Sequence, residues 1–135
     1  MTTPKMILAT AEVHGERGYA QQIKTAAHEI KSDEPERRGG TNTGPSPFEL
    51  MLSSLGACTA ITLRMYSDRK QWELGTMDVK LRLVKEGDTQ TIERLITISA
   101  SLNDEQKGKV LEIADKTPVT KALAAGIPIK TTLAG

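Results

Sequence analysis

The feature that most constrains this chain is a long uncharged stretch near its middle. From Leu50 to Leu63 no residue is charged, and apolar side chains fall on every side of a helical projection of this stretch. A helix that is apolar on all sides is a buried helix and not an amphipathic surface helix. We therefore expect a long central helix that the rest of the protein covers from several directions.

Both ends of this helix are marked in the sequence. Ser46, Pro47 and Glu49 stand in the order of an N-cap, a proline at the first helical position and a capping-box glutamate. Charged residues return after Leu63, and we expect the helix to end near Arg69. The two signals together predict one uninterrupted helix.

The segments before the central helix read as short strands and a loop. Residues 6–32 are rich in strand formers and predict two or three short antiparallel strands, with a turn near Arg17. Residues 33–45 hold glycine, proline and charges without a periodic apolar pattern, which is typical of a loop. A loop of this length in a compact domain is often functional.

The segments after the central helix predict a hairpin, two shorter helices and a last strand. Apolar residues alternate with polar ones over residues 79–98, with Ile92, Ile96 and Ile98 on one face and a turn at residues 87–88. Helix starts follow at about residues 103 and 118, and residues 127–133 read as a strand. Strands, helix, strands and helices in this order predict an α+β fold with antiparallel sheets, as one domain over residues 1–135.

The size of the chain bears on how the central helix is covered. The 135 residues make one ordinary domain, which buries only part of the surface of its unfolded chain. Short strands from a single chain offer little cover for a helix that is apolar all round. An intertwined homodimer, in which two such helices pack together and the strands of each subunit cover both, is the simplest remedy.

Composition excludes several classes of function. The chain has 18 basic and 17 acidic residues, a net charge of +1, and only 3% aromatic residues. This argues against a nucleic-acid partner, which needs a basic surface or stacking aromatic side chains. No stretch reaches the ~18 apolar residues of a membrane span, and the first residues lack the apolar region of a signal peptide. We expect a cytoplasmic protein without a membrane partner.

The one cysteine, Cys58, is the leading candidate for covalent chemistry. A single cysteine excludes a disulfide scaffold, and His14 and His28 lack metal-ligand spacing, so we expect no metal and no other cofactor. Free cysteine is often a packed core residue. A reactive thiolate would need a nearby cation, because burial alone raises the pKa of a thiol. Cys58 is thus either structural or activated by its surroundings.

Three charged residues are candidates for that activation. Glu49 lies nine residues before Cys58, so contact between them needs a bend at Gly56 or a partner subunit; its alternative role is the capping box. Arg17 stands at the predicted hairpin tip, and Arg38 stands in the long loop. Either arginine is an ordinary solvated group or a cation that folds over the thiol and holds an anion in bidentate fashion.

The sequence resembles a known family over nearly its whole length. Residues 39–72, with GPSPFEL followed by GAC, resemble the OsmC/Ohr family of thiol-dependent organic hydroperoxide reductases, in the branch whose cysteine follows the glutamate by nine residues. IADKTPVTKAL, residues 113–123, is similar to the second family signature. The resemblance implies an intertwined α+β homodimer with two sites at the subunit interface. It also implies that Cys58 attacks the peroxide, assisted by Glu49 and by Arg17 or Arg38.

The chain departs from this family at one position of consequence. The second signature normally carries a cysteine before proline, which closes a disulfide with the oxidised first cysteine; here that position is Thr117. Threonine forms no disulfide, so the resemblance implies that an external thiol must resolve the oxidised Cys58.

Three functions stay open at this point. The first is reduction of organic hydroperoxides through Cys58, an oxidative-stress activity in which an external thiol reduces the oxidised Cys58. The second is non-catalytic binding of a small hydrophobic molecule, with Cys58 structural. The third is acyl transfer or hydrolysis at Cys58 with His14 or His28 as the base.

Overall fold

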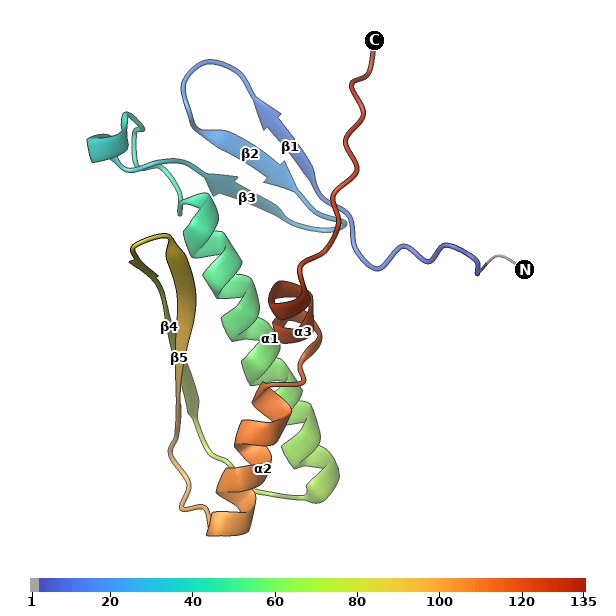
Figure 1. Ribbon diagram of the computed structural model, residues 1–135, viewed down its shortest axis with the longest axis vertical. Helices are drawn as coiled ribbons and strands as arrows, with labels where there is room; N and C mark the ends of the chain where they lie inside the picture. Colours follow the sequence, from blue (N-terminus) through green and yellow to red (C-terminus); the bar gives the residue numbers. More distant parts are fainter. Residues whose placement is uncertain (1–2) are drawn as a thin grey trace. The chain divides into compact units, whose positions relative to one another are not determined.

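The computed structural model describes residues 3–135, which form two compact units. The first unit ends at Met51, and the second runs from Leu52 to Gly135. Helix α1 (Pro47–Lys70) begins in the first unit and continues through the second (Figure 1).

The N-terminal unit contains one antiparallel sheet of three short strands. Strands β1 (Glu12–Gly15), β2 (Gln21–Lys24) and β3 (Glu29–Ser32) pair in the order β1-β2-β3. Val13 lies opposite Ile23, and Ile23 lies opposite Ile30, so the β-branched residues form one row across the sheet. The prediction of two or three antiparallel strands in this region is confirmed.

A single carboxylate organises the loop that follows β3. Asp33 is 2% exposed and accepts hydrogen bonds from the backbone N–H and the hydroxyl of both Thr41 and Thr43, and from the N–H of Glu34. The hydroxyl of Thr41, followed by the other donors, holds the pKa of Asp33 far below its ordinary value. A side chain at Gly40 would collide with the carbonyl of Glu34, so this tight loop requires glycine there. The loop and its 3₁₀ turn η1 (Glu36–Arg38) are therefore ordered around Asp33.

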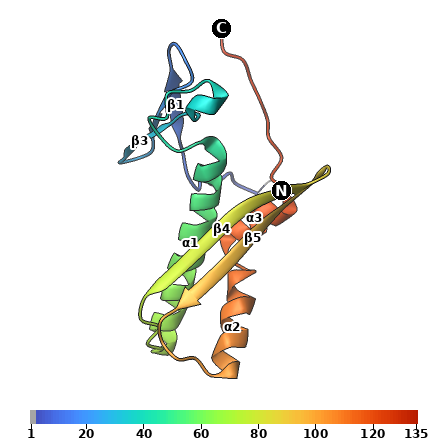
Figure 2. The ribbon, with the colours of Figure 1, turned by 90° about the vertical axis from the view of Figure 1, so that its left-hand side faces the viewer.

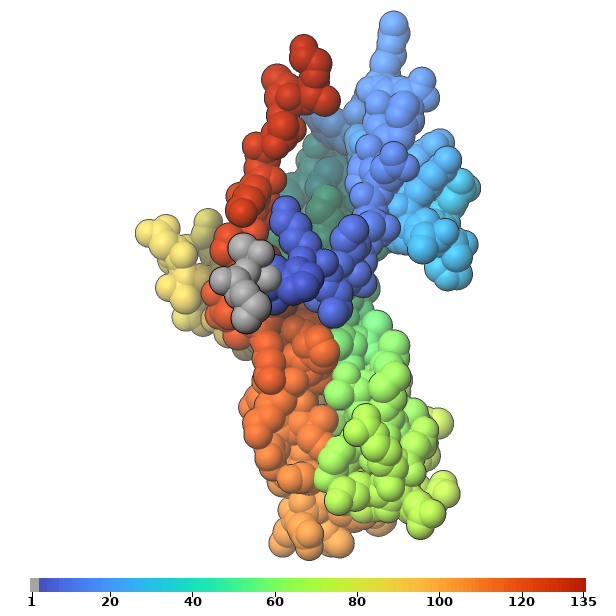
Figure 3. Space-filling view, turned by 90° about the vertical axis from the view of Figure 1, so that its right-hand side faces the viewer, coloured from blue at the N-terminus to red at the C-terminus, as the bar shows by residue number. Residues whose placement is uncertain are grey.

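The C-terminal unit packs a hairpin across three helices. Strands β4 (Met77–Glu86) and β5 (Thr89–Ile98) form an antiparallel pair, and helices α2 (Asp104–Ala114) and α3 (Pro118–Ala125) follow. The hairpin lies across α1 and the two shorter helices (Figure 2). Figure 3 shows α2 alongside the C-terminal half of α1.

One stripe of α1 is buried within the chain. Its buried residues, Leu55, Thr59, Leu63 and Ser67, recur every fourth position and alternate apolar and hydroxyl side chains. Gly56 brings the helix close to β4, because a Cβ there would lie 2.8 Å from Cδ1 of Leu81. Other apolar residues of α1 remain outside: Ile61 and Met65 are 54% and 55% exposed. The expected cover of the central helix from several directions is therefore incomplete within the described chain, which buries one side of the helix.

The local start signals in the sequence are confirmed. Asn103 caps α2 in a capping box with Gln106, and Thr117 caps α3, whose first residue is Pro118. Gly126, with φ of 75°, ends α3. The expected α+β class, with antiparallel sheets and a long central helix, is confirmed as well.

The expected last strand is not formed. Residues 126–135 are extended but pair with no strand in residues 3–135, and Ile129 and Leu133 are 89% and 95% exposed. The sequence pattern specifies a strand, but a strand also needs a neighbouring edge, which this segment does not have within the described chain. No helix within residues 3–135 combines the length and apolarity needed to span a membrane.

We expect Asp33→Asn to lower the midpoint of thermal unfolding at neutral pH by roughly 5 °C, because it removes the charge that five donors stabilise. The folded pKa lies below the ordinary value of 3.8, so the stabilisation is complete above that value and is lost as pH falls below it. The gap between wild type and variant should therefore narrow below about pH 4 in circular-dichroism melts. Asp88→Asn, in the exposed β4–β5 turn, is the matched control. If the difference in unfolding midpoint between wild type and Asp33→Asn stayed the same below pH 4, the charge of Asp33 would not be the source of the stabilisation.

Candidate functional site

The single cysteine lies in the middle of α1. Cys58 is half-buried and forms no disulfide, and its Sγ lies 3.9 Å from the hydroxyl of Thr62, one helical turn further on. A thiol of this exposure is neither sealed in the core nor fully solvated.

Immediately after Cys58, α1 meets an arginine from the hairpin. Thr59 is fully buried, and its hydroxyl donates to the carbonyl of Leu55 at 2.7 Å. The same hydroxyl accepts a hydrogen bond from Nη1 of Arg94 on β5, at 3.0 Å. This contact links the cysteine-bearing turn of α1 to the sheet.

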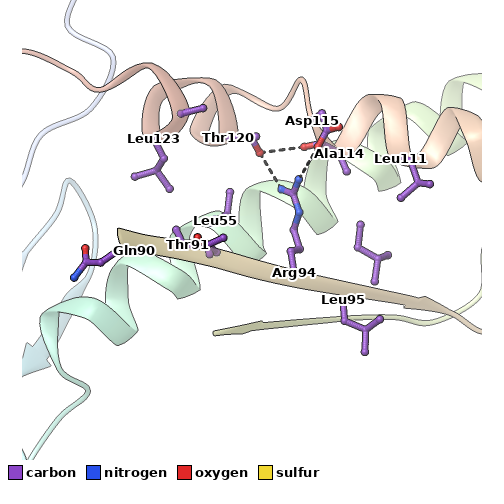
Figure 4. Close-up of a pocket in the computed structure, with 13 residues that line it drawn as sticks. Leu55, Gln90, Thr91, Arg94, Leu95, Leu111, Ala114, Asp115, Thr120 and Leu123 are labelled. Atoms are coloured by element: carbon purple, nitrogen blue, oxygen red, sulfur yellow. Dashed lines mark hydrogen bonds and ion pairs between the residues drawn. The ribbon is translucent and has the colours of Figure 1, made fainter. Parts of the chain in front are cut away.

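Arg94 also contacts the α2–α3 junction (Figure 4). Its Nη1 donates to the hydroxyl of Thr120 at 2.9 Å, and its Nη2 lies 3.3 Å from Oδ1 of Asp115. The side chain of Arg94 is 14% exposed, whereas that of Asp115 is 81% exposed. One guanidinium therefore joins α1, β5 and the start of α3.

Thr117, at the position where the resemblance expects a second cysteine, is part of the same network. It is fully buried, and its hydroxyl lies 2.6 Å from that of Thr120. Thr120 donates its own hydrogen to the carbonyl of Ala114 at 3.0 Å, so the Thr117 hydroxyl is the donor between the two threonines. The same Thr117 oxygen accepts from the N–H of Thr120 as the N-cap of α3. The group at this position is a fixed cap.

A cavity of about 720 Å³ opens beside this network. Its polar lining residues are Gln90, Thr91, Arg94, Asp115 and Thr120, and Cys58 does not line it. Its apolar lining residues are Leu55, Ile92, Leu95, Ile96, Leu111, Ala114, Leu123 and Ala124. The cavity can accept an apolar molecule beside a small polar cluster.

Glu49 takes the capping role in the N-terminal unit. Its Oε1 accepts a hydrogen bond from the N–H of Ser46 at 2.8 Å, and its own N–H donates to Oγ of Ser46 at 3.2 Å. These hydrogen bonds, with a smaller contribution from the charge of Arg37, lower the pKa of Glu49. Glu49 is thus ionised at neutral pH, and the predicted capping box is confirmed. Its role toward Cys58 stays a prediction.

The two predicted arginines also lie in the N-terminal unit. Arg17 is exposed in the connection between β1 and β2, and Arg38 ends η1 with its Nη1 3.9 Å from Oε2 of Glu34. Their roles toward Cys58 stay predictions. Among residues 3–135, no group of three or more histidine, cysteine, aspartate or glutamate side chains is placed to hold a metal ion.

Sequence reasoning missed Arg94, although a signal for it is present. Arg94 stands in the same alternating row as Ile92, Ile96 and Ile98, which face inward, while Leu95 faces out at 63% exposure. A charged residue within an apolar row, next to an outward leucine, marks a position that burial alone does not explain.

Comparisons with known proteins show the family and the fold of this chain. The model of the OsmC-like protein family matches residues 40–132. Among solved structures, a Psychrobacter arcticus protein named for a suggested osmotic stress and detoxification response has a TM-score of 0.74 at 18% identity, over 90% of this chain and 91% of its own. No curated protein matches the sequence.

Two further structures carry a more specific name. An organic hydroperoxide resistance protein, OsmC, from Legionella pneumophila has a TM-score of 0.63 at 17% identity, over 89% of this chain and 91% of its own. An organic hydroperoxide resistance protein from Elizabethkingia anophelis has a TM-score of 0.66 at 17% identity, over 92% of this chain and 93% of its own. The fold is that of these proteins, and the chain belongs to the OsmC-like protein family.

The capping box gives a way to separate the two roles of Glu49. Ser46→Ala should lower the free energy of unfolding by about 1 kcal/mol, because it removes the acceptor of an N-cap hydrogen bond. Glu49→Gln should cost less than that, because glutamine also serves at this position of a capping box. Urea unfolding of both variants measures the difference. A larger loss in Glu49→Gln than in Ser46→Ala would show that the negative charge itself stabilises the helix start.

Proposed function

We propose that this protein is an OsmC-like thiol peroxidase that reduces organic hydroperoxides at Cys58 in an oxidative-stress response. The observation that carries the proposal is the half-buried, free Cys58 on the helix that the family model covers. The names of the Legionella pneumophila and Elizabethkingia anophelis structures support the substrate class.

The proposed first step forms an S–O bond and breaks an O–O bond. The thiolate of Cys58 attacks the terminal oxygen of the hydroperoxide, the alkoxide leaves, and a proton from solvent converts it to the alcohol. Cys58 is oxidised to a sulfenic acid and the peroxide is reduced. Glu49 and one of Arg17 or Arg38 are proposed to assist this step, and the ionised state of Glu49 at neutral pH suits a role in orienting that arginine.

The proposed second half of the cycle uses an external thiol. One thiol condenses with the sulfenic acid to give a mixed disulfide and water, and a second thiol releases Cys58 and leaves as the oxidised disulfide. The hydroxyl at Thr117 forms no disulfide and is committed to the cap of α3, which supports an outside reductant. A cytoplasmic location would supply such thiols.

A homodimer is part of the proposal. Ile61 and Met65 of α1 and the extended residues 126–135 expose apolar side chains that a second copy of the chain would cover. The proposed sites then lie where two subunits meet, which is how the N-terminal charged residues of one subunit could approach Cys58.

The cavity favours one alternative function. Its apolar side and its polar cluster would suit a small hydrophobic molecule without any reaction at Cys58. In that case the chain would be a binding protein and Cys58 a packing residue.

Reaction of the reduced protein with cumene hydroperoxide tests the proposal. We expect rapid, stoichiometric formation of a sulfenic acid, detected by intact mass after trapping with dimedone, and thiol-dependent peroxide turnover. Both the sulfenic acid and the turnover should vanish in Cys58→Ser, because that variant lacks the only cysteine of the chain. Glu49→Gln should slow the reaction at least about tenfold, while Ser46→Ala, the capping control, should not. Turnover that survives in Cys58→Ser would rule out the mechanism.

Thr117→Cys tests the interpretation of the second position. If position 117 corresponds to that of the missing cysteine, hydroperoxide should convert the variant to a disulfide between residues 58 and 117 and not to a stable sulfenic acid. Peptide mapping under non-reducing conditions identifies the disulfide between residues 58 and 117. Thr120→Cys, one turn further along α3, is the matched control and should give less of such a bond. Persistent sulfenic acid in Thr117→Cys would show that the two positions do not approach each other.

A further inference from the structure

The half-buried row of strand β5 contains one charged residue, Arg94. Along β5 the half-buried positions are Ile92, Arg94, Ile96 and Ile98, and the residues between them are exposed. Leu95 lies on the exposed face at 63%. The strand therefore places a cation inside and a leucine outside, the reverse of the arrangement that burial alone favours.

The burial of this cation is not balanced by a buried carboxylate. Within residues 3–135 the one acid at ion-pair distance from Arg94 is Asp115, and its side chain is 81% exposed. An exposed ion pair contributes little to stability, whereas removing a guanidinium from water is costly. A leucine at this position would complete the apolar row at lower cost. The arginine therefore has a role that its contribution to stability does not explain.

The short contacts of Arg94 go to two neutral hydroxyl groups. Its Nη1 donates to Thr59 at 3.0 Å and to Thr120 at 2.9 Å, which uses both hydrogens of that nitrogen. Each threonine passes its own hydrogen to a helix carbonyl, that of Leu55 or that of Ala114. The two acceptors are thus fixed in orientation, and the nitrogen between them sets their separation.

These two hydroxyls stand beside the two positions that matter for the proposed chemistry. Thr59 directly follows Cys58 on α1. Thr120 accepts a hydrogen bond from Thr117, the cap of α3. The guanidinium therefore lies between the turn that carries the reactive thiol and the turn that carries the substituted second position.

We infer that Arg94 is a positioning residue that holds the Cys58–Thr59 turn of α1 against the first turn of α3 and so fixes the placement of the Cys58 thiol. The inference rests on the proposed function in taking Cys58 as the reactive group. Arg94 acts through Thr59 and Thr120 and does not itself contact the reacting atoms. Arg94 is one of the residues that line the cavity beside this network.

The first test removes the guanidinium from the inward face. Arg94→Leu should keep the midpoint of thermal unfolding or raise it, yet slow sulfenic-acid formation by cumene hydroperoxide about tenfold or more, because small misplacement of a reacting group has large effects on rate. Arg82→Leu is the matched control: Arg82 lies on the neighbouring strand, 75% exposed, and pairs with Glu93. The control should react as the wild type does.

The second test asks whether Arg94 acts through its hydroxyl partner. Thr59→Val removes the acceptor at nearly constant volume and should slow the reaction by a similar factor. The double variant Arg94→Leu/Thr59→Val should react no more slowly than either single variant, because both substitutions remove the same hydrogen bond between Arg94 and Thr59. In Arg94→Ala, guanidinium chloride at a non-denaturing concentration should restore part of the rate, while sodium chloride should not. A general loss of stability would not respond in this way, because guanidinium weakens folding.

The outcomes separate this inference from the proposed function. If wild-type Cys58 does not react with the hydroperoxide, the proposed function fails, and the rate of alkylation by iodoacetamide then takes the place of peroxide in the same variants. If Arg94→Leu does not fold, Thr59→Val alone decides. An unchanged rate in Arg94→Leu or Thr59→Val, additive losses in the double variant, or no rescue by guanidinium would each overturn the positioning role.

Discussion

The C-terminal unit depends on the stripe of α1 that faces the hairpin and the shorter helices. Leu55 and Leu63 supply apolar contact along this stripe, while Thr59 and Ser67 place hydroxyls between them. Each hydroxyl donates to a carbonyl of the same helix, so burial leaves no unsatisfied group at either position. The stripe can therefore pack tightly and still offer one oxygen, that of Thr59, to a donor from another element.

The parts of the fold that are determined locally could be predicted from the sequence. The capping boxes at Ser46 and Asn103 and the Thr117–Pro118 helix start involve residues three or four apart, and the structure contains each of them. The C-terminal strand could not be predicted in the same way, because residues 127–133 specify only the extended backbone. Whether a strand forms depends on a partner edge, and that is a property of the assembled protein.

The site shows the same division between local and distant information. Cys58 could be singled out as the only cysteine, and the capping contacts of Glu49 followed from its spacing to Ser46. Arg94 was not predicted as a site residue, because the inward face of its strand was inferred from the isoleucines alone. Its meaning depends on Thr59, 35 residues earlier, and on Thr120, 26 residues later. No spacing rule connects positions this far apart, although an arginine in an apolar row is itself a visible signal.

The threonine at position 117 has a mechanical consequence as well as a chemical one. A cysteine that closes a disulfide exchanges one bonding partner for another during each cycle. Thr117 is instead fully buried, caps α3 and donates to Thr120, which Arg94 holds from the other side. This arrangement fixes the start of α3. A fixed start of α3 suits the proposed cycle, in which the thiol that resolves Cys58 arrives from solution and position 117 takes no part in bond exchange.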